Sequence, residues 1–251
     1  MQRYRNVHIS FKYYSVAQAF SSPKVGNDGL MKIRKVGAEF LGSAFLVMTV
    51  IGSGEMAQSL STDVAVQLLA NSLCTAAILY LLITLLGDVS GAHFNPLVTL
   101  ITLYKRQISV SQTMQFLFAQ FLGALTGAGL ANLLFDLPLF TASTKIRSGD
   151  NLLLSEIIAT AGLIFTIFIA IDQSKEKKIP VLVACWIGAA YFFTSSTSFA
   201  NPAVTFARGW SNTFAGIAPE SIAPFIGAQL VGAVIGLVLS QSLSSKGKRK
   251  K

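Results

Sequence analysis

The few residues of this chain that could do chemistry occur in pairs. Asparagine followed by proline occurs at Asn95 and again at Asn201, and a glutamate, Glu39 or Glu156, stands in an apolar run ahead of each. An ionisable group in such a run suggests by default a function such as proton coupling. Asparagine is a strong helix N-cap, and proline suits the first helical position. Each pair therefore predicts a short helix that begins at an asparagine side chain.

Enzyme chemistry has little support in the sequence. It contains no metal-ligand cluster, phosphate-binding glycine loop or nucleophile elbow, so we expect no enzyme, metal or cofactor. His93 and Asp88 lie near one another, but no nucleophile accompanies them, so an intramembrane enzyme is poorly supported. The cysteines, Cys74 and Cys185, lie in apolar runs and are expected to be small, buried and reduced.

Six apolar runs must position these residues. The chain is 52% hydrophobic and only 12% charged, whereas a soluble domain is about 25% charged. A bilayer crossing takes about 20 mostly apolar residues, and in lipid the backbone must satisfy its own hydrogen bonds, which favours helices. The predicted spans are residues 36–57, 64–86, 112–135, 152–172, 179–198 and 221–243.

The basic residues are distributed unevenly about these spans. They gather before the first span, after the second, between the fourth and fifth, and at the end of the chain. With six spans, all these segments fall on one side, and the other side has only Lys145 and Arg147, apart from Arg208. This asymmetry predicts that both termini are cytoplasmic. It assigns the net charge of +9 to membrane orientation rather than to a nucleic-acid partner.

We expect one membrane domain, residues 36–243, between basic tails at 1–35 and 244–251. The first 30 residues lack the long apolar core of a signal peptide. Translation could start at Met1 or at Met31, because "MKIRKVGAEF" runs straight into the first span.

The domain contains an internal repeat, about residues 36–135 and 152–243. The matched polar residues are Glu39 and Glu156, Asn95 and Asn201, and Gln120 and Gln229. Three spans per half make the repeats inverted, a plan found in channels and transporters. A Gly-x-x-x-Gly pair follows each glutamine, and such spacing is typical of close helix packing in lipid.

The Asn-Pro segments are too short to cross a bilayer. About ten residues at 1.5 Å each reach ~15 Å, half of the hydrocarbon core. Two such half-helices, one from each side, would meet N-terminus to N-terminus near the midplane. Non-helical backbone at that depth must be buried in protein or line a watery cavity.

The motifs "SGAHFNPLVT" and "SFANPAVT", the repeated glutamates and the "AQ…G…G" helices resemble the aquaporin (major intrinsic protein) family over about residues 36–243. The resemblance implies an all-α membrane protein with six transmembrane helices and two re-entrant half-helices in an inverted three-helix repeat. It also implies a homotetramer in a cell membrane, a bacterial inner membrane, with one pore per subunit for water and small uncharged solutes.

By this resemblance, the two asparagines donate hydrogen bonds to passing solutes, and the half-helix N-termini add positive potential. Aquaporin-type pores are themselves the standard example of half-helix dipoles that exclude protons and cations. The implied pore motif is Asn95, Pro96, Leu97, Asn201, Pro202 and Ala203.

The family also implies supporting roles for three residues. Glu39 and Glu156 would brace the re-entrant loops by accepting backbone hydrogen bonds, rather than carry protons. His93 would position the first loop, with a pH-sensitive group as the alternative.

The outer constriction departs from the family pattern. Its four positions in this chain are Thr75, Ala189, Ser198 and Val204, and Ala190 or Tyr191 are alternatives for Ala189. Val204 stands where an arginine is usual, so a wider and less polar opening is expected. The width and polarity of the constriction decide which solutes pass. The expected solutes therefore include, besides water, glycerol, urea and metalloid hydroxides such as arsenous or boric acid. The stretch "TSSTSFANPAVT" also resembles bacterial aquaporins linked to arsenic resistance.

Three questions stay open at this point. Leu97 replaces a usual alanine and would narrow the pore, separate the half-helices or close the lumen of a purely structural protein. Arg208 lies four residues beyond Val204 on the same helical face, about 6 Å farther out. It would form a displaced positive group in the external vestibule or be bound to loop carbonyls. A secondary transporter is the alternative function, because inverted repeats also build those.

Overall fold

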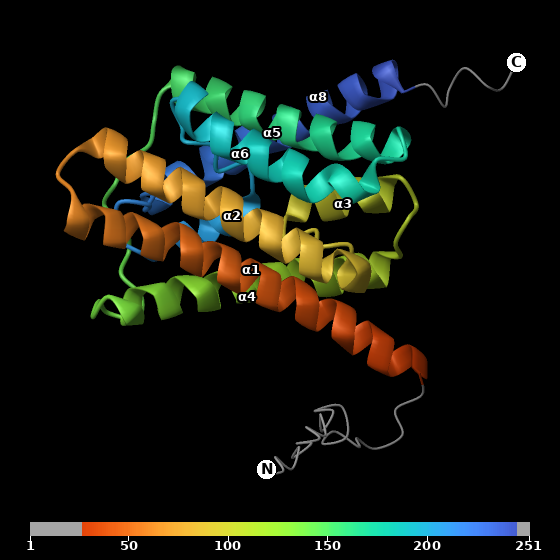
Figure 1. Ribbon diagram of the computed structural model, residues 1–251, viewed down its shortest axis with the longest axis horizontal. Helices are drawn as coiled ribbons and strands as arrows, with labels where there is room; N and C mark the ends of the chain where they lie inside the picture. The colour runs from red at the N-terminus through yellow and green to blue at the C-terminus, as the bar shows by residue number, and fades with distance from the viewer. Residues whose placement is uncertain (1–26, 245–251) are drawn as a thin grey trace, which may run out of the picture.

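The computed structural model describes residues 27–244, which form a helical bundle (Figure 1). The helices in the described part are α1 (Asn27–Leu60), α2 (Val64–Ser90), α3 (Pro96–Tyr104), α4 (Val110–Leu134), α5 (Asp150–Asp172), α6 (Ile179–Phe193), α7 (Pro202–Arg208) and α8 (Pro219–Leu243), with a short 3-10 helix, η2 (Glu176–Lys178), before α6. No residue of this range pairs as a strand, so the predicted all-α class is confirmed.

Within residues 27–244, five helices are long and apolar enough to cross a membrane: α1, α2, α4, α5 and α8. The sixth, α6, has 15 residues, about 22 Å at 1.5 Å per residue. The predicted span 179–198 is therefore too long at its end. The helix stops because Thr194 is extended, and its N–H and hydroxyl both donate to the carbonyl of Ala190.

The two halves of the chain use the same packing. Helix α1 packs against α4 and α5 packs against α8, while α2 lies against α6 (Figure 1). A Cβ added to Gly127 would lie 2.1 Å from the carbonyl oxygen of Ala44, and one added to Gly236 would lie 2.3 Å from that of Ala161. The glycine four residues earlier in each helix makes the same close approach. The packing interpretation of both Gly-x-x-x-Gly pairs is confirmed.

The start of α1 and the end of α8 lie at the same end of the bundle, as an even number of crossings requires (Figure 1). Helix α1 begins at Asn27, so residues 27–35 belong to the first helix and not to a separate tail. The rest of the expected N-terminal tail, and residues 245–251 of the C-terminal one, lie outside the described residues.

The two cysteines contradict their expected burial. Both Cys74 and Cys185 are free and exposed on the side of the bundle. Their apolar helices present these faces outward, and in a membrane protein an apolar outer face contacts lipid rather than a protein core.

Candidate functional site

A buried carboxylate supports the loop in front of α3. One oxygen of Glu39 accepts hydrogen bonds from the Ser90 hydroxyl at 2.6 Å and the His93 N–H at 2.9 Å. The other accepts from the Phe94 N–H and the Gln120 amide, both at 2.8 Å. Glu39 itself is fully buried. Because both oxygens are engaged, the geometry is that of a brace.

The second half repeats this arrangement bond for bond. One oxygen of Glu156 accepts from the Ser196 hydroxyl at 2.6 Å and the Phe199 N–H at 2.9 Å. The other accepts from the Ala200 N–H at 2.9 Å and the Gln229 amide at 2.7 Å. The loops before α3 and α7 therefore have the same support.

Sequence reasoning missed two further pairs in these networks. Each glutamine also donates to a threonine of the half-helix, Gln120 to Thr99 at 2.9 Å and Gln229 to Thr205 at 2.8 Å. The serine of each network, named above, stands five residues before the motif asparagine, and the threonine stands four after it. Both spacings are present in the stretches "SGAHFNPLVT" and "TSSTSFANPAVT", so comparing the repeats position by position would have found them.

The brace holds backbone in an unusual conformation. Ala92 and Phe94 in the first loop, and Ser198 and Ala200 at the matched places in the second, have φ between 46° and 52°. Residues other than glycine rarely adopt this region, at a cost on the order of 1–3 kcal/mol each. The N–H groups of Phe94 and Ala200, and those of the residues after Ala92 and Ser198, donate hydrogen bonds to the two glutamates. These bonds offset the cost of the strained backbone.

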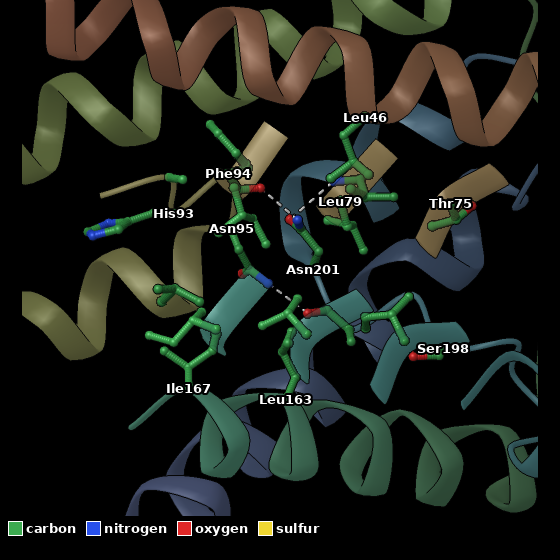
Figure 2. Close-up of a pocket in the computed structure, with 18 of the residues that line it drawn as sticks. Leu46, Thr75, Leu79, His93, Phe94, Asn95, Leu163, Ile167, Ser198 and Asn201 are labelled. Carbon is green, nitrogen blue, oxygen red and sulfur yellow. Dashed lines mark hydrogen bonds between the residues drawn. The ribbon is translucent and has the colours of Figure 1, made fainter. Parts of the chain in front are cut away.

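The paired asparagines connect the two half-helices. The Asn95 amide donates to the carbonyl of Ala200 at 2.8 Å, and the Asn201 amide donates to that of Phe94 at 2.7 Å (Figure 2). The oxygen of each amide accepts from its own helix, from the N–H two residues on. An amide nitrogen carries two N–H groups. Among the described residues, the second N–H of each of these two amides has no hydrogen-bond acceptor.

Both asparagines line a cavity of about 230 Å³ that extends past each half-helix. Its walls are mainly apolar and come from α1, α2, α5 and α6; Leu46, Leu79, Leu163 and Ile167 are examples (Figure 2). The cavity therefore has few polar groups, and apolar side chains separate them along its wall.

Three of the four predicted constriction residues line this cavity: Thr75, Ser198 and Val204. The assignment of Ala189 was wrong, because that residue is exposed on the outside of α6 and does not line the cavity. Tyr191, one of the alternatives, lines it instead, and its hydroxyl is 3.0 Å from that of Thr75. The α6 residues that line the cavity recur every fourth position up to Tyr191, and Ala189 lies about 200° away from Tyr191 around the helix.

Arg208 also lines the cavity but does not project freely into a vestibule. It is 2% exposed, and its Nε donates to the carbonyl of Ala215. Its guanidinium lies 3.4 Å from the centroid of the Phe199 ring. The arginine is thus bound to a loop carbonyl, as one of the two interpretations expected, and still faces the lumen.

Leu97 neither narrows the cavity nor separates the half-helices. It is 2% exposed and packs in an apolar cluster that includes Ile164 and Phe168. It is absent from the cavity lining, and Ala203, its counterpart, is buried in the same way. His93 does line the cavity, with Nδ1 3.0 Å from the Thr99 hydroxyl and its ring edge-on to Phe116.

Two more cations lie in the loop between α4 and α5. Arg147 donates from Nε to the carbonyl of Gly216 at 2.9 Å, and its guanidinium lies 4.9 Å from the Phe199 centroid. Burial lowers the pKa of Arg147 to about 10. Lys145 donates to the carbonyl of Phe214 at 2.8 Å. Partial burial, then the charges of Arg147 and Arg208, lower the pKa of Lys145 to about 8.

An inverted helical repeat whose half-helices meet at paired asparagines on one cavity defines a membrane channel rather than an enzyme. The family model of the major intrinsic proteins matches residues 28–200, so the chain belongs to this family. It is therefore a multi-pass membrane protein of the aquaporin type, as the motifs predicted.

Similar proteins agree with this membership. The chain is 46% identical over 210 residues to aquaglyceroporin AqpS of Rhizobium meliloti (strain 1021), covering 84% of this chain and 90% of that protein. It is 28% identical to human aquaporin-4 over 229 residues, covering 85% and 69% of the two chains. The fold matches the crystal structure of the aquaglyceroporin from Plasmodium falciparum, with a TM-score of 0.63 and 21% identity over 85% of this chain and 96% of that one.

Proposed function

We propose that the protein is a passive channel for water and small uncharged solutes, with glycerol as the first candidate. The name of its relative AqpS, an aquaglyceroporin at 46% identity, supports this solute class. The secondary transporter is disfavoured, because proton-coupled transport usually uses a carboxylate that is free to bind the proton. Glu39 and Glu156 each accept four hydrogen bonds from the protein.

One observation carries the proposal of a wide filter. Val204 lines the cavity at the position where an arginine is usual, beside the small polar side chains of Thr75 and Ser198. Tyr191 adds bulk, but its hydroxyl is bonded to Thr75 at the wall. A wider, less polar constriction binds water less specifically and admits polyhydroxy or amide solutes. Urea and neutral metalloid hydroxides, such as arsenous or boric acid, belong to the same proposed class.

We also propose a homotetramer with both termini in the cytoplasm, in a bacterial inner membrane. The basic residues on the side of the termini support the orientation. Exposed apolar side chains along the spanning helices, Leu73 and Leu81 of α2 among them, suit contact with lipid or other subunits.

The experiment is stopped-flow light scattering of proteoliposomes that contain the full chain. Water, glycerol, urea, boric acid and arsenite at neutral pH are applied in turn. Flux that rises linearly with solute concentration and ignores proton and sodium gradients supports the channel. Saturable uptake driven by such a gradient would overturn it. Water flux without glycerol flux would support the proposal of a channel and contradict the proposal of a wide filter.

A further inference from the structure

Three successive carbonyls of the loop after α7 each accept a hydrogen bond from a cationic side chain. The acceptors are residues 214–216, and the donors, in the same order, are Lys145, Arg208 and Arg147. Two of these donors come from the loop between α4 and α5, and Arg208 comes from α7 itself. The loop after α7 therefore gathers positive charge beside this end of the cavity.

The gathered charge is only partly balanced by carboxylates. Within residues 27–244, none of the three cations has a carboxylate within ion-pair distance. The charge of Glu156 acts on both arginines, but its oxygens already accept four hydrogen bonds. Glu55 accepts a bond from the N–H of residue 214. Carbonyl groups satisfy donors without adding a net charge, so an excess of positive charge remains.

Arg208 has hydrogen-bonding capacity that the protein does not use. A guanidinium has five N–H groups, and among the described residues only the Nε–H of Arg208 has an acceptor. The side chain is buried and lines the cavity. Its guanidinium carbon lies 3.4 Å from the Phe199 centroid, so the ring covers a face of the group rather than its edge. The terminal N–H groups at that edge are thus left for a partner in the cavity.

Ser198 supplies a second polar group without a partner on the same cavity wall. Its hydroxyl is buried and has no hydrogen-bond partner among the described residues. Val204, one turn before Arg208 on the same face of α7, is short and neutral. Unsatisfied buried polar groups cost free energy. This wall therefore favours a ligand that accepts hydrogen bonds from both the serine and the arginine.

We propose that the end of the cavity near α7 binds a small carboxylate. Its two oxygens accept from the terminal N–H groups of Arg208, because a guanidinium fork matches a carboxylate through two parallel hydrogen bonds. The Ser198 hydroxyl donates to the same carboxylate. Arg147, whose guanidinium lies 4.9 Å from the same Phe199 ring, adds to the attraction through its charge.

The bound anion blocks the entrance instead of passing through. Farther in, the cavity walls are mainly apolar, and a charge without a partner is costly to bury. A carboxylate at Arg208 therefore stays at this end and lowers the flux of neutral solutes. The blocking rests on the proposed channel function, whereas the binding site does not.

The first measurement is direct binding to the full chain in detergent, by saturation-transfer NMR of the ligand's methyl protons. Acetate is compared with acetamide, which has nearly the same shape and no charge, at neutral pH and constant chloride. Acetate should bind, and acetamide should bind at least about tenfold more weakly, because charge-assisted hydrogen bonds are the stronger ones.

Matched variants assign the binding to named groups. Arg208→Gln should weaken acetate binding at least about tenfold. Arg208→Lys keeps the charge and loses the fork, so its affinity should lie between those of Arg208→Gln and the wild type. Ser198→Ala should weaken binding by a smaller factor. Lys105→Gln is the control and should bind acetate like the wild type, because Lys105 lies near α3 and pairs with Asp172.

The second measurement is glycerol flux into proteoliposomes with acetate on both sides of the membrane. Acetate should lower this flux in the wild type in proportion to its occupancy, relative to equal chloride, and should have no effect in Arg208→Gln. A protein that binds acetate and conducts no glycerol would contradict the proposed function and still support the site. The two failures are therefore distinguishable.

Several outcomes would overturn the proposal. A wild type that does not bind acetate, or that binds acetamide equally well, has no carboxylate site. Equal losses in Lys105→Gln and Arg208→Gln would show a general attraction by charge. Acetate binding without inhibition of glycerol flux, or an acetate current across the membrane, would contradict the blocked entrance. If Arg208→Gln fails to fold, Ser198→Ala and the comparison of acetate with acetamide still decide.

Discussion

The two half-helices are alike inside the pore motif and differ one turn beyond it. Val98 of α3 and Val204 of α7 are each three residues after the motif asparagine, and both line the cavity. Four residues farther on, Thr102 in α3 corresponds to Arg208 in α7, and both again line the cavity. The Thr102 hydroxyl donates to the carbonyl of Val98 at 2.7 Å and stays neutral. The pore is thus symmetric at its centre and carries an arginine on one side alone.

The two ends of the cavity, one near α3 and the other near α7, also differ in their charged residues. Near α3, Lys105 pairs with Asp172 at 3.7 Å, which is the one ion pair within residues 27–244. Near α7, the three cations Lys145, Arg147 and Arg208 bond to carbonyls of the loop after α7 instead. Phe199, the counterpart of His93, contacts two of them through its ring. The centre of the pore is therefore repeated in the two halves, whereas the charged residues near its two ends are not.

The largest predicted effect comes from breaking the symmetric part. Either Glu39→Ala or Glu156→Ala removes an acceptor of four hydrogen bonds, and each unsatisfied buried donor costs about 1–3 kcal/mol. Since total stability is about 5–15 kcal/mol, we expect little folded protein from either variant. The recovered fraction in size-exclusion chromatography measures this.

A matched control is Glu55→Ala, because Glu55 accepts a single backbone bond, from Phe214 at 3.2 Å. That variant should be recovered like the wild type. If one brace variant folds normally and the other does not, the two halves are not equivalent, and the symmetric description is wrong.

An intermediate effect is predicted for the asymmetric pair. Arg208→Ala removes a charge from the cavity wall and a contact with Phe199, so cation leak should rise several-fold in proteoliposomes. Thr102→Ala should leave the leak unchanged, because Thr102 is neutral. Ion flux under a potassium gradient and solute permeability are both measured. Unchanged cation exclusion and solute preference in Arg208→Ala would end the idea that this arginine replaces the usual filter charge.

The smallest effect concerns the pH dependence of stability that comes from Lys145, near α7. Lys145 has a pKa of about 8 in the folded protein against an ordinary 10.5. Between these values the unfolded chain holds the proton that the folded protein has lost, so stability rises with pH across this window. Below about pH 8 both states are protonated and this contribution is absent.

The measurement is the difference in thermal midpoint between pH 7.5 and 9.5, compared for wild type and Lys145→Gln in the same detergent. Because other groups titrate as well, the comparison between the two proteins is what counts. An identical pH dependence in both would mean that Lys145 is not perturbed.

The repeated features of this protein were predictable from its sequence. The inverted repeat, the N-capping asparagines and the glycine contacts follow from residues that occur twice at matched spacing, so each half checks the other. The position of Tyr191 was not, because a count along the chain does not show which face of α6 lines the cavity, and residues 189 and 191 lie on different faces. The environment of Arg208 depends on Ala215 in an unrepeated loop, for which the sequence offers no such check.

The central claim, that Val204 leaves the filter wide, is tested most directly by the ratio of glycerol to water permeability in proteoliposomes. Val204→Arg restores a cation at this position, and Val204→Leu adds bulk without charge. The wild type should conduct both solutes, and Val204→Arg should lower the ratio on the order of tenfold, more than Val204→Leu does. A wild-type pore that excludes glycerol, or a ratio that Val204→Arg leaves unchanged, would contradict the account.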